Sequence, residues 1–261
     1  IIIPLLCSYR GGSKGLSSTY EQAHVGLDLL PWYQLYSRKE NIMPVTDYLV
    51  RNAELYPDEV ALVELNPDEK DTRRTTWKEF DLIQPINNMP YRREITWSVF
   101  NEKANRFANM LLSRGVKKGD KVAILMYNCL EWLPIYFGVL KTGAIAVPFN
   151  FRYDSDEIYY CAELAQVDVI VFGFAFIGRI EVNAERLSRG RLLIYVGDNC
   201  PSFAESYHEL VADCSSKEPD VKITEDDYGA IYFSSGTTGF PKAILHLSLI
   251  HISEPTRLAL I

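Results

Sequence analysis

Short apolar runs recur along the chain and determine its expected architecture. They are rich in Val, Ile and Ala and bounded by Gly, Pro or Asp, which is typical of strands buried on both faces. We expect such strands at residues 121–126, 144–148, 167–172, 192–196 and 228–233. Between these runs, apolar residues spaced by three or four predict helices at residues 131–141, 155–165, 177–188 and 203–211. Because strands and helices alternate, we expect an α/β fold with a mostly parallel sheet flanked by helices.

The region before this alternation is less regular. A β-rich segment at residues 59–64 is predicted as a strand. Thr96 precedes apolar residues spaced by three or four, so we expect it to cap a helix, as Asp154 or Ser155 should cap the helix at 155–165. We interpret residues 70–94 as an inserted loop with a short helical turn.

The composition is that of an ordinary globular protein. The chain has 261 residues, of which 48% are hydrophobic and 23% charged. Its net charge of -7 argues against a nucleic-acid partner, which would favour a basic face. No stretch approaches the ~18 apolar residues of a membrane span, so we expect a soluble protein without an integral membrane segment. One arginine-rich stretch, interpreted as a solvated helix face, comprises Arg179, Glu181, Glu185, Arg186, Arg189 and Arg191.

The cysteines are odd in number and far apart in the sequence. They are Cys7, Cys129, Cys161, Cys200 and Cys214. Without a Cys-x-x-Cys pair, this set fits buried thiols in a reducing compartment better than a disulfide framework or a zinc site. We therefore expect a cytoplasmic location and no metal held by cysteine.

The densest polar chemistry follows the strand expected at 228–233. The sequence there reads Ser234-Ser235-Gly236-Thr237-Thr238-Gly239-Phe240-Pro241-Lys242. Glycines allow backbone N–H groups to approach phosphates, Ser and Thr hydroxyls add donors, and the Lys ammonium offsets the charge. It is not a Walker A loop, which has four residues between its glycines and Lys directly after the second. A flexible turn is the plain alternative, but ligands bind at the carboxyl ends of strands in open α/β sheets, so we predict a polyphosphate-binding loop.

The full string Ser-Ser-Gly-Thr-Thr-Gly-x-Pro-Lys resembles the phosphate-binding signature of the AMP-forming adenylating enzymes. This superfamily includes acyl-CoA synthetases, luciferases and peptide-synthetase adenylation domains. Residues 105–108 and 115–124 look like the first helix and strand of that fold, and the resemblance extends over about residues 44–246. It implies an incomplete N-terminal domain of the adenylate-forming enzyme fold.

The resemblance also implies a reaction. A carboxylic acid and ATP with Mg²⁺ would give an acyl-adenylate and diphosphate, and coenzyme A would then take the acyl group. Ala243 after the lysine favours an acyl-CoA synthetase over a peptide-synthetase domain. The residues expected to bind the phosphates are Ser234, Ser235, Gly236, Thr237, Thr238, Gly239 and Lys242.

The chain departs from that family at its ends. Residues 1–42 look like an extension before a start near Met43, and residues 43–246 would form the partial AMP-binding domain. Residues 247–261 resemble a translated sequencing adapter, so we expect a foreign tail. The later family motifs are absent, so we expect a fragment without catalytic residues, inactive by itself, with exposed apolar surface. The alternatives are a non-catalytic nucleotide- or phosphate-binding module and a plain structural α/β domain.

Overall fold

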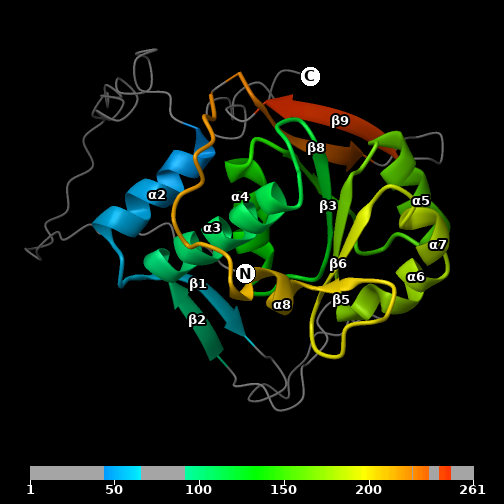
Figure 1. Cartoon of the computed structure of the whole chain (residues 1–261), viewed down its shortest axis with the longest axis horizontal. Coiled ribbons are helices and arrows are strands. Elements are labelled where there is room, and N and C mark those ends of the chain that lie inside the picture. Colours follow the sequence, from blue (N-terminus) through cyan, green and yellow to red (C-terminus); the bar gives the residue numbers. More distant parts are fainter. Residues whose placement is uncertain (1–43, 66–91, 225, 235–240, 248–261) are drawn as a thin grey trace, which may run out of the picture.

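The protein is represented by a computed structural model that describes residues 44–65, 92–224, 226–234 and 241–247 (Figure 1). Its helices of four or more residues are α2 (Val45–Leu55), α3 (Trp97–Ser113), α4 (Trp132–Lys141), α5 (Ser155–Leu164), α6 (Ile177–Glu181), α7 (Ala184–Leu187) and α8 (Tyr207–Ala212). Its strands are β1 (Val60–Leu65), β2 (Arg92–Thr96), β3 (Lys121–Leu125), β4 (Ile145–Pro148), β5 (Val169–Gly173), β6 (Leu192–Val196), β7 (Glu205–Ser206), β8 (Tyr228–Ser234) and β9 (Lys242–Leu247).

A seven-stranded sheet forms the centre of the molecule. Its strand order is β7-β6-β5-β3-β4-β8-β9. The strands from β7 to β8 are parallel, and β9 runs antiparallel to β8. The predicted α/β class with a mostly parallel sheet is confirmed, as are the strands expected before the phosphate loop.

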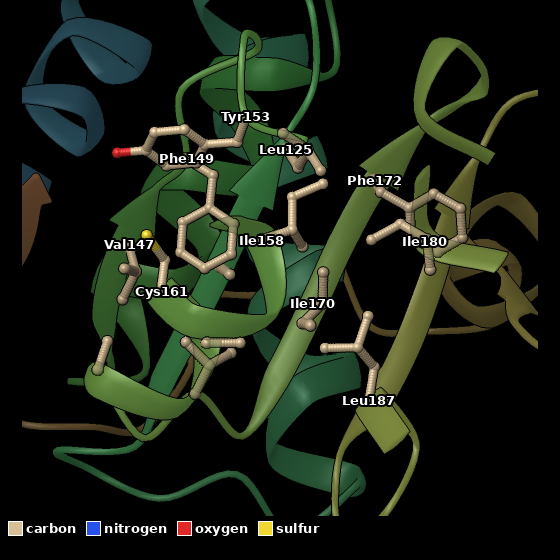
Figure 2. Packing of buried hydrophobic residues seen from close by; sticks show 14 of the residues in the cluster. Leu125, Val147, Phe149, Tyr153, Ile158, Cys161, Ile170, Phe172, Ile180 and Leu187 are labelled. Atoms are coloured by element: carbon tan, nitrogen blue, oxygen red, sulfur yellow. The ribbon is translucent and has the colours of Figure 1, made fainter. Parts of the chain in front are cut away.

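Two hydrophobic cores cover the two faces of this sheet because side chains alternate along each strand. On one face, Leu125 and Val147 pack with residues of α5, α6 and α7, including Ile158 and Leu187 (Figure 2). On the other face, the strands pack against α3, α4 and α8. The helices therefore lie in layers on both sides of the sheet (Figure 1).

A smaller unit lies beside α3. Strands β1 and β2 pair antiparallel, and Leu49 of α2 and Leu62 of β1 are buried in a third cluster with Phe100 and Ala104 of α3. Thr96 caps α3 as predicted, since its Oγ1 accepts a hydrogen bond from the backbone N–H of Val99 at 3.4 Å.

Three predicted elements differ from the structure. Residues 92–96 form β2 where a loop over 70–94 was expected, because they complete the ladder of β1; residues 66–91 lie outside the described part. The helix predicted at 177–188 is divided into α6 and α7, and the buried Asn183 between them donates to the carbonyl of Ser155 at 2.9 Å. The helix predicted at 203–211 begins only at Tyr207, because residues 205–206 pair with β6.

The solvated face expected for the arginine-rich stretch is wrong for two of its members. Arg179 donates to the carbonyl of Phe151 at 2.6 Å, and Arg191 donates to the carbonyl of Val167 at 2.8 Å. Both guanidinium groups satisfy loop carbonyls that no strand or helix uses. The exposed pair of Arg189 and Glu185, at 2.7 Å, fits the expectation.

The cysteines are less uniform than expected. Cys161 is buried and Cys129 is half-buried, and burial raises the pKa of Cys161 to about 11 and that of Cys129 to about 12. Cys200 is exposed, so the expectation of buried thiols is wrong there, because it lies in the surface loop between β6 and β7. The four cysteines within the described ranges are free thiols, and Cys7 lies outside those ranges.

Candidate phosphate-binding site

The β8–β9 hairpin brings the two ends of the predicted phosphate loop together. Ser234, the last residue of β8, and Lys242, the first residue of β9, are partners in the antiparallel ladder. Both side chains are exposed, whereas Pro241 is buried. The hydroxyl and the ammonium therefore begin and end the same loop at the carboxyl end of β8.

The central residues of the predicted loop are not described. Ser235, Gly236, Thr237, Thr238 and Gly239 lie outside the described residues. Their role in binding phosphate stays a prediction from the sequence.

The end of β8 is fixed on both faces by aromatic side chains. On one face, the ring of Phe233 packs edge-on against Phe149 and Tyr153, with centroids 5.8 and 6.4 Å apart. On the other face, the hydroxyl of Tyr232 lies 3.1 Å from the hydroxyl of Tyr136 on α4. Because successive side chains of a strand point to opposite faces, this dipeptide ties the end of β8 to α4 on one face and to the segment between β4 and α5 on the other.

The segment that follows β4 is itself held in place beneath Phe233. Arg179 donates to the carbonyls of Phe151 and Tyr153, at 2.6 and 3.0 Å. The side chain of Asn150 accepts a hydrogen bond from the backbone N–H of Arg152 at 3.0 Å, which forms a local turn. Phe149 and Tyr153, which support the phosphate loop through Phe233, therefore belong to a segment whose carbonyls at Phe151 and Tyr153 are hydrogen-bonded by Arg179.

Two tyrosines beside the site, Tyr136 and Tyr153, have raised pKa values. Burial, followed by the neighbouring Tyr232, raises the pKa of Tyr136, and burial with the neighbouring Cys161 raises the pKa of Tyr153. A phenol with a raised pKa keeps its proton at physiological pH and is a poor general base. These tyrosines support the site by packing and hydrogen bonding and supply no base.

The described residues contain no group of three or more His, Cys, Asp or Glu side chains placed to hold a metal ion. Nor does any helix among them have the length and apolar character needed to cross a bilayer.

The hairpin also exposes apolar side chains. Tyr228 of β8 is 51% exposed, and Ile244 and Leu245 of β9 are 46% and 47% exposed. These three side chains give the hairpin exposed apolar surface.

The aromatic support was missed by the sequence analysis, although part of its signal was visible. Tyr232 and Phe233 end an apolar strand, and the two-residue period of strands places them on opposite faces. Their partners Phe149, Tyr153 and Tyr136 are separated from them by about 80 residues or more, as the sequence numbers show, and nothing local identifies them. Only the strand order, with β8 beside β4, brings them together.

Comparisons with known proteins agree with the fold. The sequence profile of the AMP-binding enzyme family matches residues 49–248. Long-chain-fatty-acid–CoA ligase FadD13 of Mycobacterium tuberculosis (strain ATCC 25618 / H37Rv) is 33% identical over 153 residues, which are 58% of this chain and 29% of that protein. Crotonobetaine/carnitine–CoA ligase of Salmonella paratyphi C (strain RKS4594) is 31% identical over 159 residues, which are 59% of this chain and 30% of that protein.

A solved structure has the same fold. The anthranilate CoA ligase AuaEII, determined in complex with anthranoyl-AMP, superposes with a TM-score of 0.65 and 25% identity, covering 79% of this chain and 35% of that one. The chain thus spans only about a third of the length of these proteins.

Proposed function

This chain belongs to the AMP-binding enzyme family, and we propose that the protein it represents is an ATP-dependent, AMP-forming acyl-CoA synthetase. The observation that carries the proposal is the register pairing of Ser234 with Lys242, which places both ends of the Ser/Thr/Gly loop at the carboxyl end of β8. Two CoA ligases at 31% and 33% identity support an acid and coenzyme A as the other substrates.

The proposed reaction has two steps. A carboxylate oxygen of the acid attacks the α-phosphorus of ATP; the new P–O bond forms as the bond to the β-phosphate oxygen breaks and diphosphate leaves. The thiol sulfur of coenzyme A then attacks the acyl carbonyl carbon, and AMP leaves with the oxygen it shared with the acid. The thiol proton passes to solvent.

The role of the loop is to hold the leaving diphosphate. Negative charge accumulates on the β- and γ-phosphates as the bond to the α-phosphate breaks, and fixed donors aimed at that charge stabilise the transition state. Lys242 supplies a positive charge, while Ser234, Ser235, Thr237 and Thr238 supply hydroxyl donors. Gly236 and Gly239 allow the backbone to approach the phosphate oxygens.

Magnesium enters this proposal only as the counter-ion of ATP, which is a substrate. No step is assigned to an ion held by the protein. Coenzyme A is likewise a substrate, and its binding site is not assigned to any described residue.

We further propose that the 261-residue chain binds nucleotide phosphates but does not complete adenylation by itself. The support is its coverage, since it matches 29% and 30% of the two CoA ligases. The second candidate, a non-catalytic phosphate-binding module, is supported by the same partial coverage of the CoA ligases.

The test is the formation of AMP and diphosphate from Mg-ATP with a panel of short to long carboxylic acids. It compares the 261-residue chain with a version extended by the part of the FadD13 sequence that follows the matched segment. Acid-dependent diphosphate release by the extended protein, lost with Lys242→Ala, supports the synthetase. ATP binding without release by either protein supports the binding module, and absence of both binding and release contradicts both proposals.

A further inference from the structure

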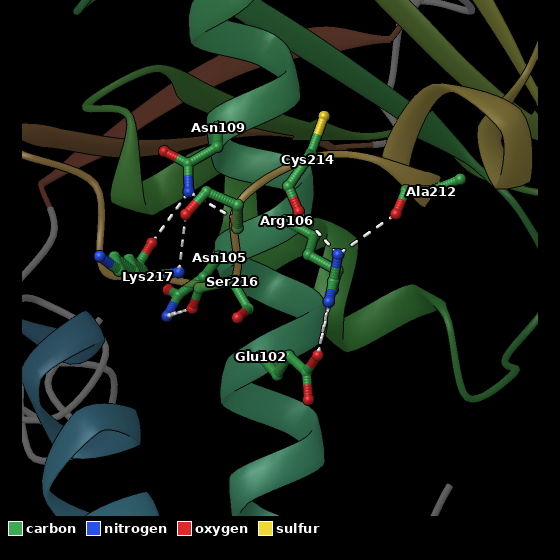
Figure 3. A network of polar contacts seen from close by, with 9 residues as sticks. Glu102, Asn105, Arg106, Asn109, Ala212, Cys214, Ser216 and Lys217 are labelled. Carbon is green, nitrogen blue, oxygen red and sulfur yellow. Dashed lines mark hydrogen bonds and ion pairs between the residues drawn. The ribbon is translucent and has the colours of Figure 1, made fainter.

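The chain between α8 and β8 runs across α3 without regular structure. We call residues 213–224 the strap. Backbone carbonyls outside helices and strands need other donors, and here side chains of α3 provide them (Figure 3). Asn109 donates to the carbonyls of Ser215 and Lys217, each at 2.8 Å, and Asn105 donates to the carbonyl of Ser216 at 3.0 Å. Three successive carbonyls of the strap are therefore bound by one helix.

The donors are arranged by the helical repeat. Asn101, Asn105 and Asn109 are spaced by four and share one face of α3. Beside them, Arg106 donates to the carbonyl of Cys214 at 2.7 Å and is oriented by Glu102 at 2.9 Å (Figure 3). Each of these contacts with the strap is made to a backbone carbonyl, so α3 fixes the path of the strap whatever side chains the strap carries.

Lys141, at the end of α4, connects the strap to this row of amides. Its ammonium donates to the side-chain oxygens of Asn101 and Asn105, both at 2.8 Å, and to the carboxylate of Glu218 in the strap. The Lys141 side chain is 1% exposed. A buried charge must be paired and hydrogen-bonded, and these three acceptors use all three N–H bonds.

A ligand at this place is the competing explanation. A cavity of about 570 Å³ lies between α2 and the strap and is lined in part by Lys141, Asp47 and Glu218. The Lys141 ammonium has no donor left for an anion. The other charged residues of the lining are Arg51 and Lys222 with Asp47, Glu54 and Glu218, so the cavity has no excess of positive charge to attract one. The hydrogen bonds that Lys141, Asn105 and Asn109 make with the strap and with each other are therefore structural and do not form an anion site. We call this set of contacts the latch.

The far end of the strap is fixed directly before β8. Lys118 forms an ion pair with Asp227 at 2.7 Å, and the carboxylate of Asp227 also accepts the backbone N–H of Thr224 at 2.7 Å. Strand β8 starts at the next residue, Tyr228.

Strand β8 depends on such support because its pairing with the parallel sheet is short. Within the described residues, its ladder with β4 contains the single pair Ala146 and Ala230. Its longer ladder is with β9, which forms a hairpin with it and does not pair with the parallel strands.

We propose that α3 and Lys141 hold the strap so that β8, and with it the phosphate loop, is kept in its binding position. Lys141 is then a positioning residue: it affects nucleotide binding without touching the nucleotide. The nucleotide part of this inference rests on the proposed function. The positional part concerns β8 alone.

The test uses hydrogen–deuterium exchange and pyrophosphate titration on the 261-residue chain. Two variants weaken the latch: Lys141→Met removes the ammonium, and Asn109→Ala removes two strap bonds while adding a good helix former to α3. The matched control is Glu185→Gln, which removes an exposed ion pair elsewhere.

In both latch variants, we expect amides of the strap and of residues 229–234 to exchange about tenfold faster, with residues 169–173 of β5 unchanged. Pyrophosphate should bind at least about fivefold more weakly, and the control should match the wild type. The second variant preserves the test if Lys141→Met fails to fold.

Faster exchange confined to the strap, or equal acceleration in β5, would overturn the positioning role. If the wild-type chain binds no pyrophosphate, the proposed function fails, and the exchange of residues 229–234 still decides whether the latch positions β8.

Discussion

Helices α3 and α4 approach closely at Gly138, and that contact allows a quantitative prediction. A Cβ atom added at Gly138 would lie 2.8 Å from the backbone oxygen of Ala104 and 2.9 Å from Cδ1 of Phe107. Both distances are shorter than real Cβ contacts, and the Ala104 oxygen belongs to the helix backbone. Gly138→Ala therefore requires α3 and α4 to move apart.

Two opposing effects decide the size of the change. Alanine is favoured over glycine in a helix interior by about 1 kcal/mol. Overpacking a close-packed core costs about 1–3 kcal/mol, and the upper half applies where backbone must move. We expect a net loss of about 1–2 kcal/mol, which lowers Tm by about 3–6 °C for a domain of this size. The separation should also loosen the contact of Asn105 with Lys141.

Gly178→Ala in α6 is the matched control. No atom lies within 4 Å of the Cβ position there, and the glycine has no positive φ. The same helix preference acts without the clash, so Tm should stay unchanged or rise by about 1–3 °C. Differential scanning calorimetry on both variants checks the pair. A Gly138→Ala protein as stable as the Gly178→Ala protein would refute the packing argument.

Three further perturbations test local features. Asp154→Ala removes an N-cap that accepts from two backbone N–H groups of α5, so Tm should fall by about 2–4 °C in calorimetry; an unchanged Tm would contradict the capping box. Burial tends to raise the pKa of Asp227, but hydrogen bonds from Lys118 and Thr224 lower it overall. Asp227→Asn should therefore cost up to about 1 kcal/mol at pH 7 in urea titrations. The difference should begin to shrink as pH falls below about 4 and should be lost once pH is below the depressed pKa of Asp227. Cys200 is exposed, whereas Cys161 is buried and burial raises its pKa to about 11. In iodoacetamide labelling at pH 8 followed by mass spectrometry, Cys200 should therefore react at least about tenfold faster than Cys161. Equal rates would count against the burial of Cys161.

Periodicity predicted the parallel sheet well because its strands are buried on both faces. The runs that became β3 and β5 consist almost entirely of Val, Ile, Ala, Leu and Phe, and each of these strands, like β6, buries four of its five residues. The capping residues Thr96 and Asp154 were also visible, since capping depends on neighbours within a few positions.

The elements that sequence missed depend on distant partners. Strand β2 forms because residues 92–96 meet β1, and Arg179 leaves its expected solvated face because the carbonyls of Phe151 and Tyr153 need a donor. The phosphate site shows the same division. Its polar residues were readable as a motif, whereas the strap and the aromatic contacts that hold β8 depend on the tertiary fold.

The central claim is that the β8–β9 hairpin binds nucleotide phosphates through its loop and Lys242. Isothermal titration of Mg-ATP and of pyrophosphate into the wild-type chain, Lys242→Ala and Lys117→Ala tests it directly; Lys117 is an exposed lysine in the turn before β3 and serves as the charge-matched control. We predict that Lys242→Ala weakens both ligands at least about tenfold, with an unchanged Tm, and that Lys117→Ala binds as the wild type does. Equal affinity of the Lys242→Ala and wild-type proteins, or no binding by the wild type, would contradict the claim.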